Sequence, residues 1–212
     1  MPDRIYAILM ASGFSKRFGT ENKLLAPFRG KPLARHTLDL VCGPDSCMDC
    51  FYRVLFVAAE DAVLALAEGL ALIPVRNGHP ELGQRESIRL GLTAAGSGEP
   101  GGESGGEEYY LFFPCDQPLL DAAAVRRVTA ARRPGCIVQP CYRGEPGNPV
   151  LFSGSFREEL LNLAQGERGR NVIGRRKENL IRLELTETPC PPPQNPLIDI
   201  DDPQTLAALD RI

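Results

Sequence analysis

Small residues and cationic side chains cluster near the start of the chain, directly after the apolar run 5–10. Ala11, Ser12 and Gly13 leave the backbone accessible, so that its N–H groups can hold anionic oxygens. The donors and positive charges that follow are Ser15, Lys16, Arg17 and Lys23. This pattern predicts a loop that binds a triphosphate, although a glycine turn with solvated lysines is the alternative. It is neither a G-x-x-x-x-G-K-[ST] loop nor a G-x-G-x-x-G loop.

A second feature is Asp116, which follows the apolar run 109–113 and stands just before Gln117 and Pro118. A carboxylate at the end of a buried strand can hold Mg²⁺ while the metal contacts triphosphate oxygens. Asp116 is therefore the leading candidate for a metal ligand. The alternative is that it caps a helix or belongs to a turn, which is the commoner role of an aspartate in this position.

The elements that must position these residues alternate between short apolar runs and amphipathic stretches of helical length. We expect strands at 5–10, 54–58, 71–75, 109–113, 136–139, 149–152 and 180–185, and helices at 32–41, 61–68, 85–95, 121–131, 154–163, 169–178 and 203–209. Asp121 and Asp202 are candidate helix N-caps. This order predicts a single α/β domain over residues 1–212, with a doubly wound, mostly parallel sheet of the Rossmann-like type.

Two further segments are expected to lie outside the regular elements. Residues 96–107 are glycine-rich and predict a flexible surface loop. Residues 189–196 are proline-rich and predict an extended connector, followed by a short final strand and a helix.

Composition excludes several classes of function. The chain has 24 basic and 27 acidic residues in 212, which gives no electrostatic footprint for long nucleic acid. It offers no signal peptide and no apolar run of membrane-spanning length, so we expect a cytoplasmic protein without a membrane partner. Seven cysteines without a secretory signal indicate reduced thiols rather than a disulfide framework.

The first loop resembles a known family pattern. Residues 9–19 followed by Lys23 are similar to the L-x-[AG]-G-x-S-x-R-[MF]-G…K motif of the MobA-like nucleotidyltransferases, which include the molybdenum cofactor cytidylyl- and guanylyltransferases. Ser12 stands where the commonest form has Ala or Gly. Residues 77–92 resemble the family segment that helps to bind base and ribose, although a capped helix would also explain them. The implied nucleotide contacts are Met10, Ala11, Ser12, Gly13, Ser15, Lys23, Gly83, Gln84 and Ser87.

Later matches occur in the family's order. Asp116 fits its [GAP]-D-x-P element, and residues 145–152 are similar to its G-x-P-x-[LV]-[FI] element, which implies that Gly147 and Asn148 face the acceptor. Glu167 is also implied on the acceptor side, where it replaces the aspartate of a G-D-x-G element, and the added methylene displaces its carboxylate. Residues 197–203 resemble D-[IV]-[DN]-T-P, with Asp202 in place of threonine. On a strand, Asp199 and Asp201 would point to opposite faces, and we favour Asp201 as the second metal ligand.

The resemblance implies an enzyme that uses Mg²⁺ and a nucleoside triphosphate, with Arg17, Lys23 and Asp116 in catalysis. The molybdenum cofactor cytidylyltransferase type is the nearest overall pattern, so CTP and molybdopterin are the implied substrates. A molybdenum hydroxylase apoenzyme or its chaperone is the implied protein partner. Alternatives are a sugar- or alditol-phosphate acceptor and a non-catalytic protein that carries the cofactor.

Three cysteines raise a competing metal hypothesis. Cys42, Cys47 and Cys50 have the C-x₄-C-x₂-C spacing of plant-type iron–sulfur proteins. They lack an adjacent fourth cysteine and have no place in the family pattern, so a thiol-rich loop is favoured. The two histidines, His36 and His79, do not lie in a zinc or triad context.

Overall fold

A computed structural model describes residues 2–13, 16–19, 22–96, 106–185 and 195–211. Its main sheet consists, in spatial order, of β10 (Leu180–Glu184), β7 (Ile137–Tyr142), β9 (Val150–Ser153), β6 (Glu108–Pro114), β1 (Arg4–Ala11), β4 (Arg53–Ala58) and β5 (Ile73–Arg76). Neighbouring strands are parallel except at β9, which runs antiparallel to both β6 and β7. The short strand β8 (Glu145–Pro146) pairs with β7, and β2 (Pro27–Phe28) pairs with β3 (Lys31–Pro32) as a separate hairpin. The predicted α/β class with a mostly parallel sheet is confirmed.

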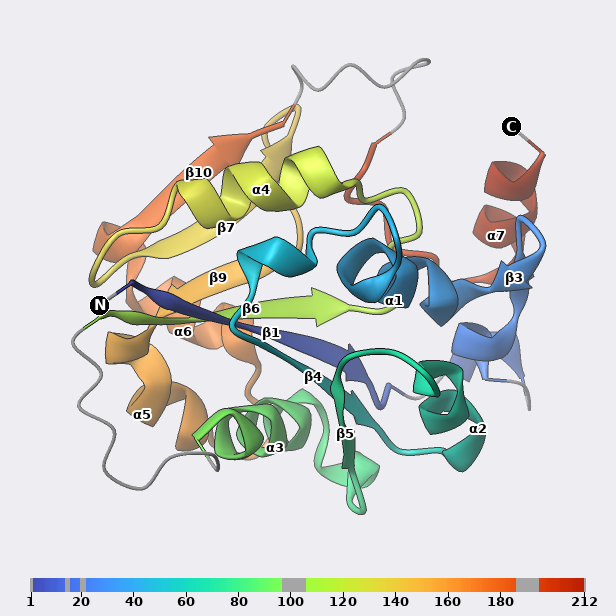
Figure 1. Ribbon diagram of the computed structural model, residues 1–212, viewed down its shortest axis with the longest axis horizontal. Coiled ribbons are helices and arrows are strands. Elements are labelled where there is room, and N and C mark those ends of the chain that lie inside the picture. The colour runs from blue at the N-terminus through green and yellow to red at the C-terminus, as the bar shows by residue number, and fades with distance from the viewer. Residues whose placement is uncertain (1, 14–15, 20–21, 97–105, 186–194, 212) are drawn as a thin grey trace.

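The helices cover both faces of this sheet (Figure 1). They are α1 (Leu33–Cys42), α2 (Asp61–Leu64), α3 (Gln84–Gly96), α4 (Ala122–Ala130), α5 (Arg157–Leu161), α6 (Gly169–Arg175) and α7 (Pro203–Asp210). Side chains of β1 alternate between two apolar clusters, because successive residues of a strand point to opposite faces. Ile5, Ala7 and Leu9 pack toward α1 and α4. Tyr6 and Ile8 pack toward α3, α5 and α6.

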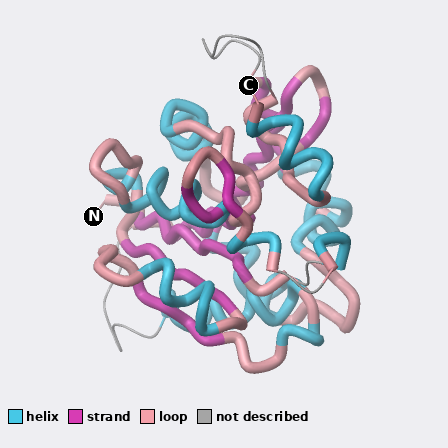
Figure 2. The backbone as a smooth tube through the Cα atoms, turned by 90° about the vertical axis from the view of Figure 1, so that its right-hand side faces the viewer, coloured by secondary structure: helices cyan, strands magenta, loops and turns pink. Residues whose placement is uncertain are grey.

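The carboxyl ends of β1 and β6 meet at the centre of the sheet, where the chain order reverses. The chain runs outward from β1 to β4 and β5, and then returns to place β6 on the other side of β1. In a doubly wound sheet this reversal opens a crevice at the carboxyl ends of the strands. Both strands point toward the side on which β3 and α7 lie, and Figure 2 shows that side facing the viewer.

A small third cluster closes this side of the molecule. Phe28 of the hairpin, Leu33 of α1 and Ile200 are fully buried together, and Leu206 and Leu209 of α7 pack against them. The final helix therefore anchors the segment that precedes it, which carries Asp199 and Asp201, next to the first loop region.

The strands predicted between residues 5 and 185 are confirmed, with small shifts at their ends. The strand expected at 71–75 begins at Ile73, because the backbone N–H of Leu72 bonds back to the carbonyl of Leu70 in a turn. Among the helices, the one expected at 61–68 is α-helical only to Leu64 and then tightens to a 3₁₀ turn, and the one expected at 154–163 begins with a 3₁₀ turn. The N-caps predicted at Asp121 and Asp202 are confirmed by bonds from the Ala124 and Thr205 N–H groups, each at 2.7 Å.

One expected element is absent from the described residues: the final strand at 197–201 does not form. Ile198 N–H instead closes a turn onto the Asn195 carbonyl, and a backbone bond from Ile200 ties the segment to Asp116. The loop predicted to be flexible, 96–107, lies mostly outside the described residues, because 97–105 are not among them. Within the described part of the chain, no helix combines the length and apolar character needed to cross a membrane.

Candidate functional site

Three predicted site residues from distant parts of the chain meet at the carboxyl edge of the sheet. The Lys23 ammonium donates to Asp116 Oδ2 at 2.6 Å and to Asp201 Oδ1 at 2.9 Å. Arg17 adds a longer ion pair from its Nη1 to Asp201 Oδ2, at 3.5 Å. Two carboxylates and two cations therefore form one continuous charged cluster.

The position of Lys23 follows from its local sequence. Lys23 begins a 3₁₀ helix that ends at Leu25, and the Asn22 side chain caps it by accepting the Leu24 N–H at 2.9 Å. Leu24 is buried in the main core, which fixes the turn. As a result the Lys23 side chain is only 13% exposed and extends over the end of β6.

Asp116 is held from two sides. It follows Pro114, the last residue of β6, and the buried Cys115, and its carbonyl oxygen accepts the Ile200 N–H at 2.9 Å. One carboxylate oxygen contacts Lys23, while the other, Oδ1, is buried and has no hydrogen-bond partner within the described residues. A buried carboxylate oxygen without a partner is costly unless something binds it.

This orphan oxygen fits the metal that the sequence implies. Mg²⁺ prefers carboxylate oxygens and commonly binds through one or two of them together with substrate phosphates. Asp116 Oδ1, with Asp201 beside it, offers such a partial ligand set. Among the described residues there is no group of three or more His, Cys, Asp or Glu side chains that could hold a metal alone. Substrate phosphates and water could complete such a set.

The charge state of Lys23 follows from its neighbours. Burial by itself would lower the pKa of the ammonium, but attraction and hydrogen bonding from Asp116 and Asp201 outweigh it, so the pKa lies above its usual value. Lys23 is therefore fully charged at neutral pH. It can neutralise an anionic ligand at this edge.

Asp199 and Asp201 were expected to point to opposite faces of a short strand, but this segment does not form a strand. Loss of solvation raises the pKa of Asp199 to about 6, with repulsion from Asp116 and Asp201 adding to the effect, although its side chain still reaches solvent. Asp199 therefore belongs electrostatically to the acidic cluster.

Gln117 is a site residue that the sequence reasoning missed. It is 2% exposed and its Nε2 donates to the Leu197 carbonyl at 2.9 Å, while its Oε1 is buried without a partner among the described residues. Together with the Ile200 bond it fastens the Asp199–Asp201 segment to the end of β6. Its place directly after Asp116 was the available signal.

The first loop lies at the same edge. Met10 and Ala11 end β1, and the Ser12 hydroxyl donates to the Val57 carbonyl of β4 at 3.3 Å, which engages the side chain with the sheet. Gly13 is exposed, and a β-carbon added there would meet no protein atom within 4 Å. Packing therefore does not explain this glycine, whereas close approach of a ligand would. Ser15 lies outside the described residues.

The segment implied for base and ribose follows β5. Gly83 has φ +77°, a conformation that favours glycine, and it is followed by the exposed Gln84 at the start of α3. Ser87 is buried, and its Oγ accepts from Asn77 Nδ2 at 3.4 Å. Asn77 is itself tied to the end of β4 through the Ala58 carbonyl. Thus Ser87 orders the loop, while Gly83 and Gln84 are exposed and available to a ligand.

The residues implied for the acceptor fall into two places. Gly147 packs against Leu197 so closely that a β-carbon there would lie 2.7 Å from the leucine Cβ, and the half-buried Asn148 follows it. They thus adjoin the Asp199–Asp201 segment. Glu167 instead accepts the Ala164 N–H at 2.9 Å and pairs with Arg175, so both its oxygens are engaged within their own loop and α6.

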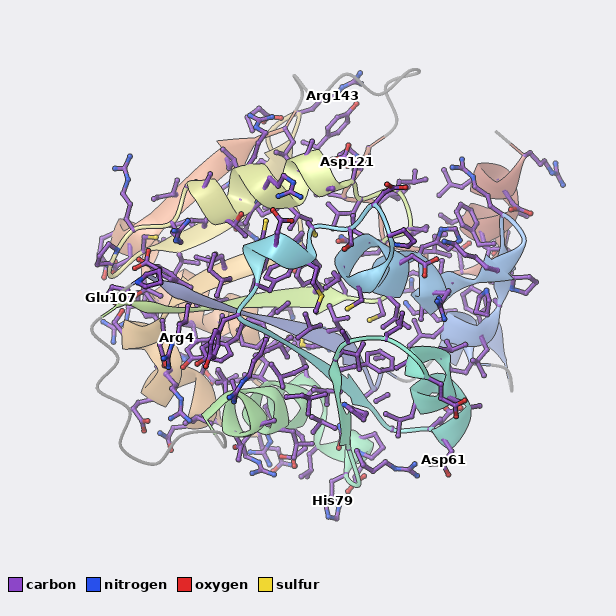
Figure 3. The ribbon with its side chains drawn as sticks, in the orientation of Figure 1. Arg4, Asp61, His79, Glu107, Asp121 and Arg143 are labelled. Carbon is purple, nitrogen blue, oxygen red and sulfur yellow. The ribbon has the colours of Figure 1, made fainter. Side chains whose placement is uncertain are left out.

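The cysteine hypothesis is not supported. Cys42, Cys47 and Cys50 are free thiols, and no metal-binding group of three ligands includes them within the described residues. Cys47 is buried, and burial raises the pKa of its thiol to about 12. His36 Nε2 donates to the Phe28 carbonyl, 2.9 Å away. His79 lies on the loop after β5, points away from the sheet and contacts Glu81 at 3.1 Å (Figure 3).

The cationic loop and the strand-end carboxylates lie at the switch point of a doubly wound α/β sheet, which is where proteins of this class bind their ligands. The model of the MobA-like NTP transferase domain matches residues 7–180, and the chain belongs to this family. It is a nucleotidyltransferase related to the molybdenum cofactor guanylyltransferases.

Two curated relatives illustrate the family's range. Nicotine blue oxidoreductase of Paenarthrobacter nicotinovorans is 27% identical over 189 residues, which cover 84% of this chain and 85% of the relative. A molybdenum cofactor guanylyltransferase of Shewanella putrefaciens is 26% identical over 166 residues, covering 76% and 75%.

Solved structures share the fold. Rv0371c of Mycobacterium tuberculosis H37Rv aligns with a TM-score of 0.74 and 20% identity over 99% of this chain and 98% of that one. A nucleotidyl transferase of Methanothermobacter thermautotroptrophicus aligns with a TM-score of 0.72 and 19% identity, over 100% of this chain and 96% of that one. A manganese complex of the mycobacterial protein aligns with a TM-score of 0.58 and 20% identity, over 86% of this chain and 88% of that one.

Proposed function

We propose that this nucleotidyltransferase binds CTP with Mg²⁺ at the Lys23–Asp116–Asp201 cluster and transfers CMP to the terminal phosphate of molybdopterin, releasing pyrophosphate. The observation that carries the proposal is the buried Oδ1 of Asp116, which has no hydrogen-bond partner in the described part of the chain, beside a charged lysine at the carboxyl edge of the sheet. Asp116 offers an oxygen that can bind a metal cation, and the adjacent Lys23 ammonium can bind a phosphate.

In the proposed reaction a phosphate oxygen of the acceptor attacks the α-phosphorus of the nucleotide, and the bond to pyrophosphate breaks in line. Such a transfer needs positioning and charge neutralisation more than a general acid or base. Lys23 and Arg17 neutralise the triphosphate and the leaving pyrophosphate. Asp116 and Asp201 hold Mg²⁺, which when bound neutralises charge on the phosphate oxygens.

The remaining assignments follow from the places of the matching segments. Gln84, exposed at the start of α3, is proposed to contact the base or ribose, with the backbone of 11–13 approaching the phosphates. Gly147 and Asn148, beside Leu197, are proposed to contact the acceptor. The molybdopterin acceptor is supported by the guanylyltransferase relative, and the choice of CTP by the resemblance of residues 83–92 and 147–152 to the cytidylyl type.

The test is pyrophosphate release with molybdopterin and Mg²⁺, with CTP, GTP, ATP and UTP measured in parallel. Release with CTP alone is expected. Release with GTP alone would keep the acceptor and overturn the base assignment. Nucleotide binding without release would favour either a sugar- or alditol-phosphate acceptor or a carrier protein. Adding those phosphates separates the two, because a carrier releases no pyrophosphate with any acceptor.

The product would go to a molybdenum hydroxylase apoenzyme or its chaperone. Transfer is checked by adding a molybdenum hydroxylase apoenzyme to the completed reaction and measuring the activity of that hydroxylase. The control is the same two-step assay with the nucleotidyltransferase left out of the first step.

A further inference from the structure

The Lys23 ammonium lies between the two carboxylates that the proposed function assigns to a cation. It contacts Asp116 Oδ2 at 2.6 Å and Asp201 Oδ1 at 2.9 Å. The Lys23 and Asp116 side chains are only 13% and 16% exposed, so this pair is poorly screened by water. Asp201, 54% exposed, forms the open side of the cluster, with Arg17 near its second oxygen.

We propose that Lys23 and a divalent cation compete for the Asp116 and Asp201 carboxylates, and that a bound triphosphate resolves the competition by drawing the ammonium to its own oxygens. Cation and nucleotide then bind cooperatively, with Lys23 as the residue that couples them. This inference rests on the proposed function of the same site.

The competition follows from the contacts. Mg²⁺ binds oxygens at about 2.0–2.1 Å and tolerates little distortion of its geometry. Asp116 Oδ1 has no protein partner within the described residues, but the Asp201 oxygens face Lys23 and Arg17. A cation held by both aspartates must therefore approach the Asp201 oxygens against the positive charges of Lys23 and Arg17, and a Lys23 ammonium that remained in place would repel it.

The triphosphate can reverse this balance because lysine is a compact charge on a flexible stem. The Lys23 backbone stays fixed in its capped 3₁₀ turn, while its side chain can move from one anion to another. If the nucleotide takes up the ammonium, the carboxylates become available to the cation. Linkage then requires the cation to raise nucleotide affinity by the same factor.

The experiment measures binding of Mn²⁺ alone to the full chain, by electron paramagnetic resonance of the free ion. Lys23→Met is expected to bind Mn²⁺ at least about fivefold more tightly than the wild type, the lower end of couplings between linked sites. Lys23→Arg, which keeps the charge, should stay near the wild type. Lys31→Met is the control for general loss of charge, because Lys31 pairs with Asp39 on α1, and its affinity should be unchanged.

A second measurement needs no variant and covers the case in which Lys23→Met does not fold. Acylation of lysine side chains is followed by mass spectrometry as Mn²⁺ is added, with Lys31 as internal reference. Reactivity of Lys23 relative to Lys31 should rise as the site fills. Equal or weaker Mn²⁺ binding by Lys23→Met, or a constant reactivity ratio, would overturn the competition and indicate that the cation is held through Asp116 Oδ1 beside the lysine.

The outcomes also separate this inference from the proposed function. Pyrophosphate release by the wild type, with unchanged Mn²⁺ affinity in Lys23→Met, removes the competition alone. Tighter Mn²⁺ binding by the variant, with no release from any nucleotide and acceptor, removes the transfer reaction and leaves the competition standing.

Discussion

Ile200 donates its backbone N–H to the carbonyl oxygen of Asp116 at 2.9 Å, which joins the segment before the last helix to the end of the central strand β6. Ile200 is completely buried against Phe28 and Leu33, so this hydrogen bond is shielded from water. It sets Asp201, the next residue, beside Asp116. The acidic half of the site is therefore a product of tertiary packing rather than of one motif.

Asp116→Asn should lower kcat/KM for pyrophosphate release by about a hundredfold or more, the scale for losing one electrostatic stabiliser. The amide keeps the shape of the side chain but removes the charge that faces Lys23 and the cation. The thermal midpoint should fall, because the largely buried Lys23 ammonium loses a charged partner, but the variant should still fold. Asp49→Asn, which removes an exposed carboxylate paired with Arg126 before β4, should keep full activity. Comparable rates for the Asp116 variant and the wild type would remove Asp116 from the mechanism.

Gln117→Ala tests how the acidic segment is held. The change leaves the Leu197 carbonyl without its buried donor, which costs about 1–3 kcal/mol of unfolding free energy. Activity should fall as well, because Asp201 loses part of its support. Gln139→Ala is the matched control, since Gln139 Nε2 reaches the Gly147 carbonyl only at 3.5 Å. Urea unfolding and kcat/KM measure both effects, and equal losses in the two variants would contradict the assigned role of Gln117.

The sequence was sufficient for the parts of the site that depend on single elements. The loop after β1 and the aspartate after β6 are each defined by an apolar run and the polar residues that end it. Parallel strands bring such ends to one edge of the sheet. Lys23 and Asp116 were each predicted to serve the nucleotide and its metal, and the structure places them in contact.

Residues 197–201 show where the sequence was misleading. Ile198, Asp199, Ile200 and Asp201 alternate as a half-buried strand would, and period-two alternation is the usual signal for one. None of the described strands pairs with this segment, and isolated bonds to Asp116 and Gln117 fix it instead. These contacts join residues far apart in the chain, so no local pattern reveals them. The same holds for the burial of Ser87 against Asn77.

Gly91→Ala and Gly174→Ala should change stability in opposite directions. A β-carbon at Gly91 of α3 would overlap Cγ2 of the fully buried Ile8 in β1, so we expect a loss of about 1–3 kcal/mol in unfolding free energy. At Gly174 of α6 a β-carbon would meet nothing within 4 Å, so alanine should gain about 0.5–1 kcal/mol through its better helix propensity. Chemical denaturation measures both. A neutral Gly91→Ala would show that α3 can move away from the sheet at little cost.

His36→Gln should change how stability depends on pH. Burial lowers the pKa of His36 below its usual 6.5, with the contact to the Phe28 carbonyl partly opposing the effect. Below pH 6.5 the unfolded chain therefore takes up a proton that the folded chain resists, and wild-type stability falls as the pH drops toward the folded pKa. Glutamine keeps a donor for the Phe28 carbonyl but does not titrate, so the variant should lose less stability between pH 7.5 and 5. Urea unfolding at both pH values gives the difference, with His79→Gln, at an exposed histidine, as the matched control. A difference between wild type and His36→Gln that is the same at both pH values would exclude His36 as a source of acid sensitivity.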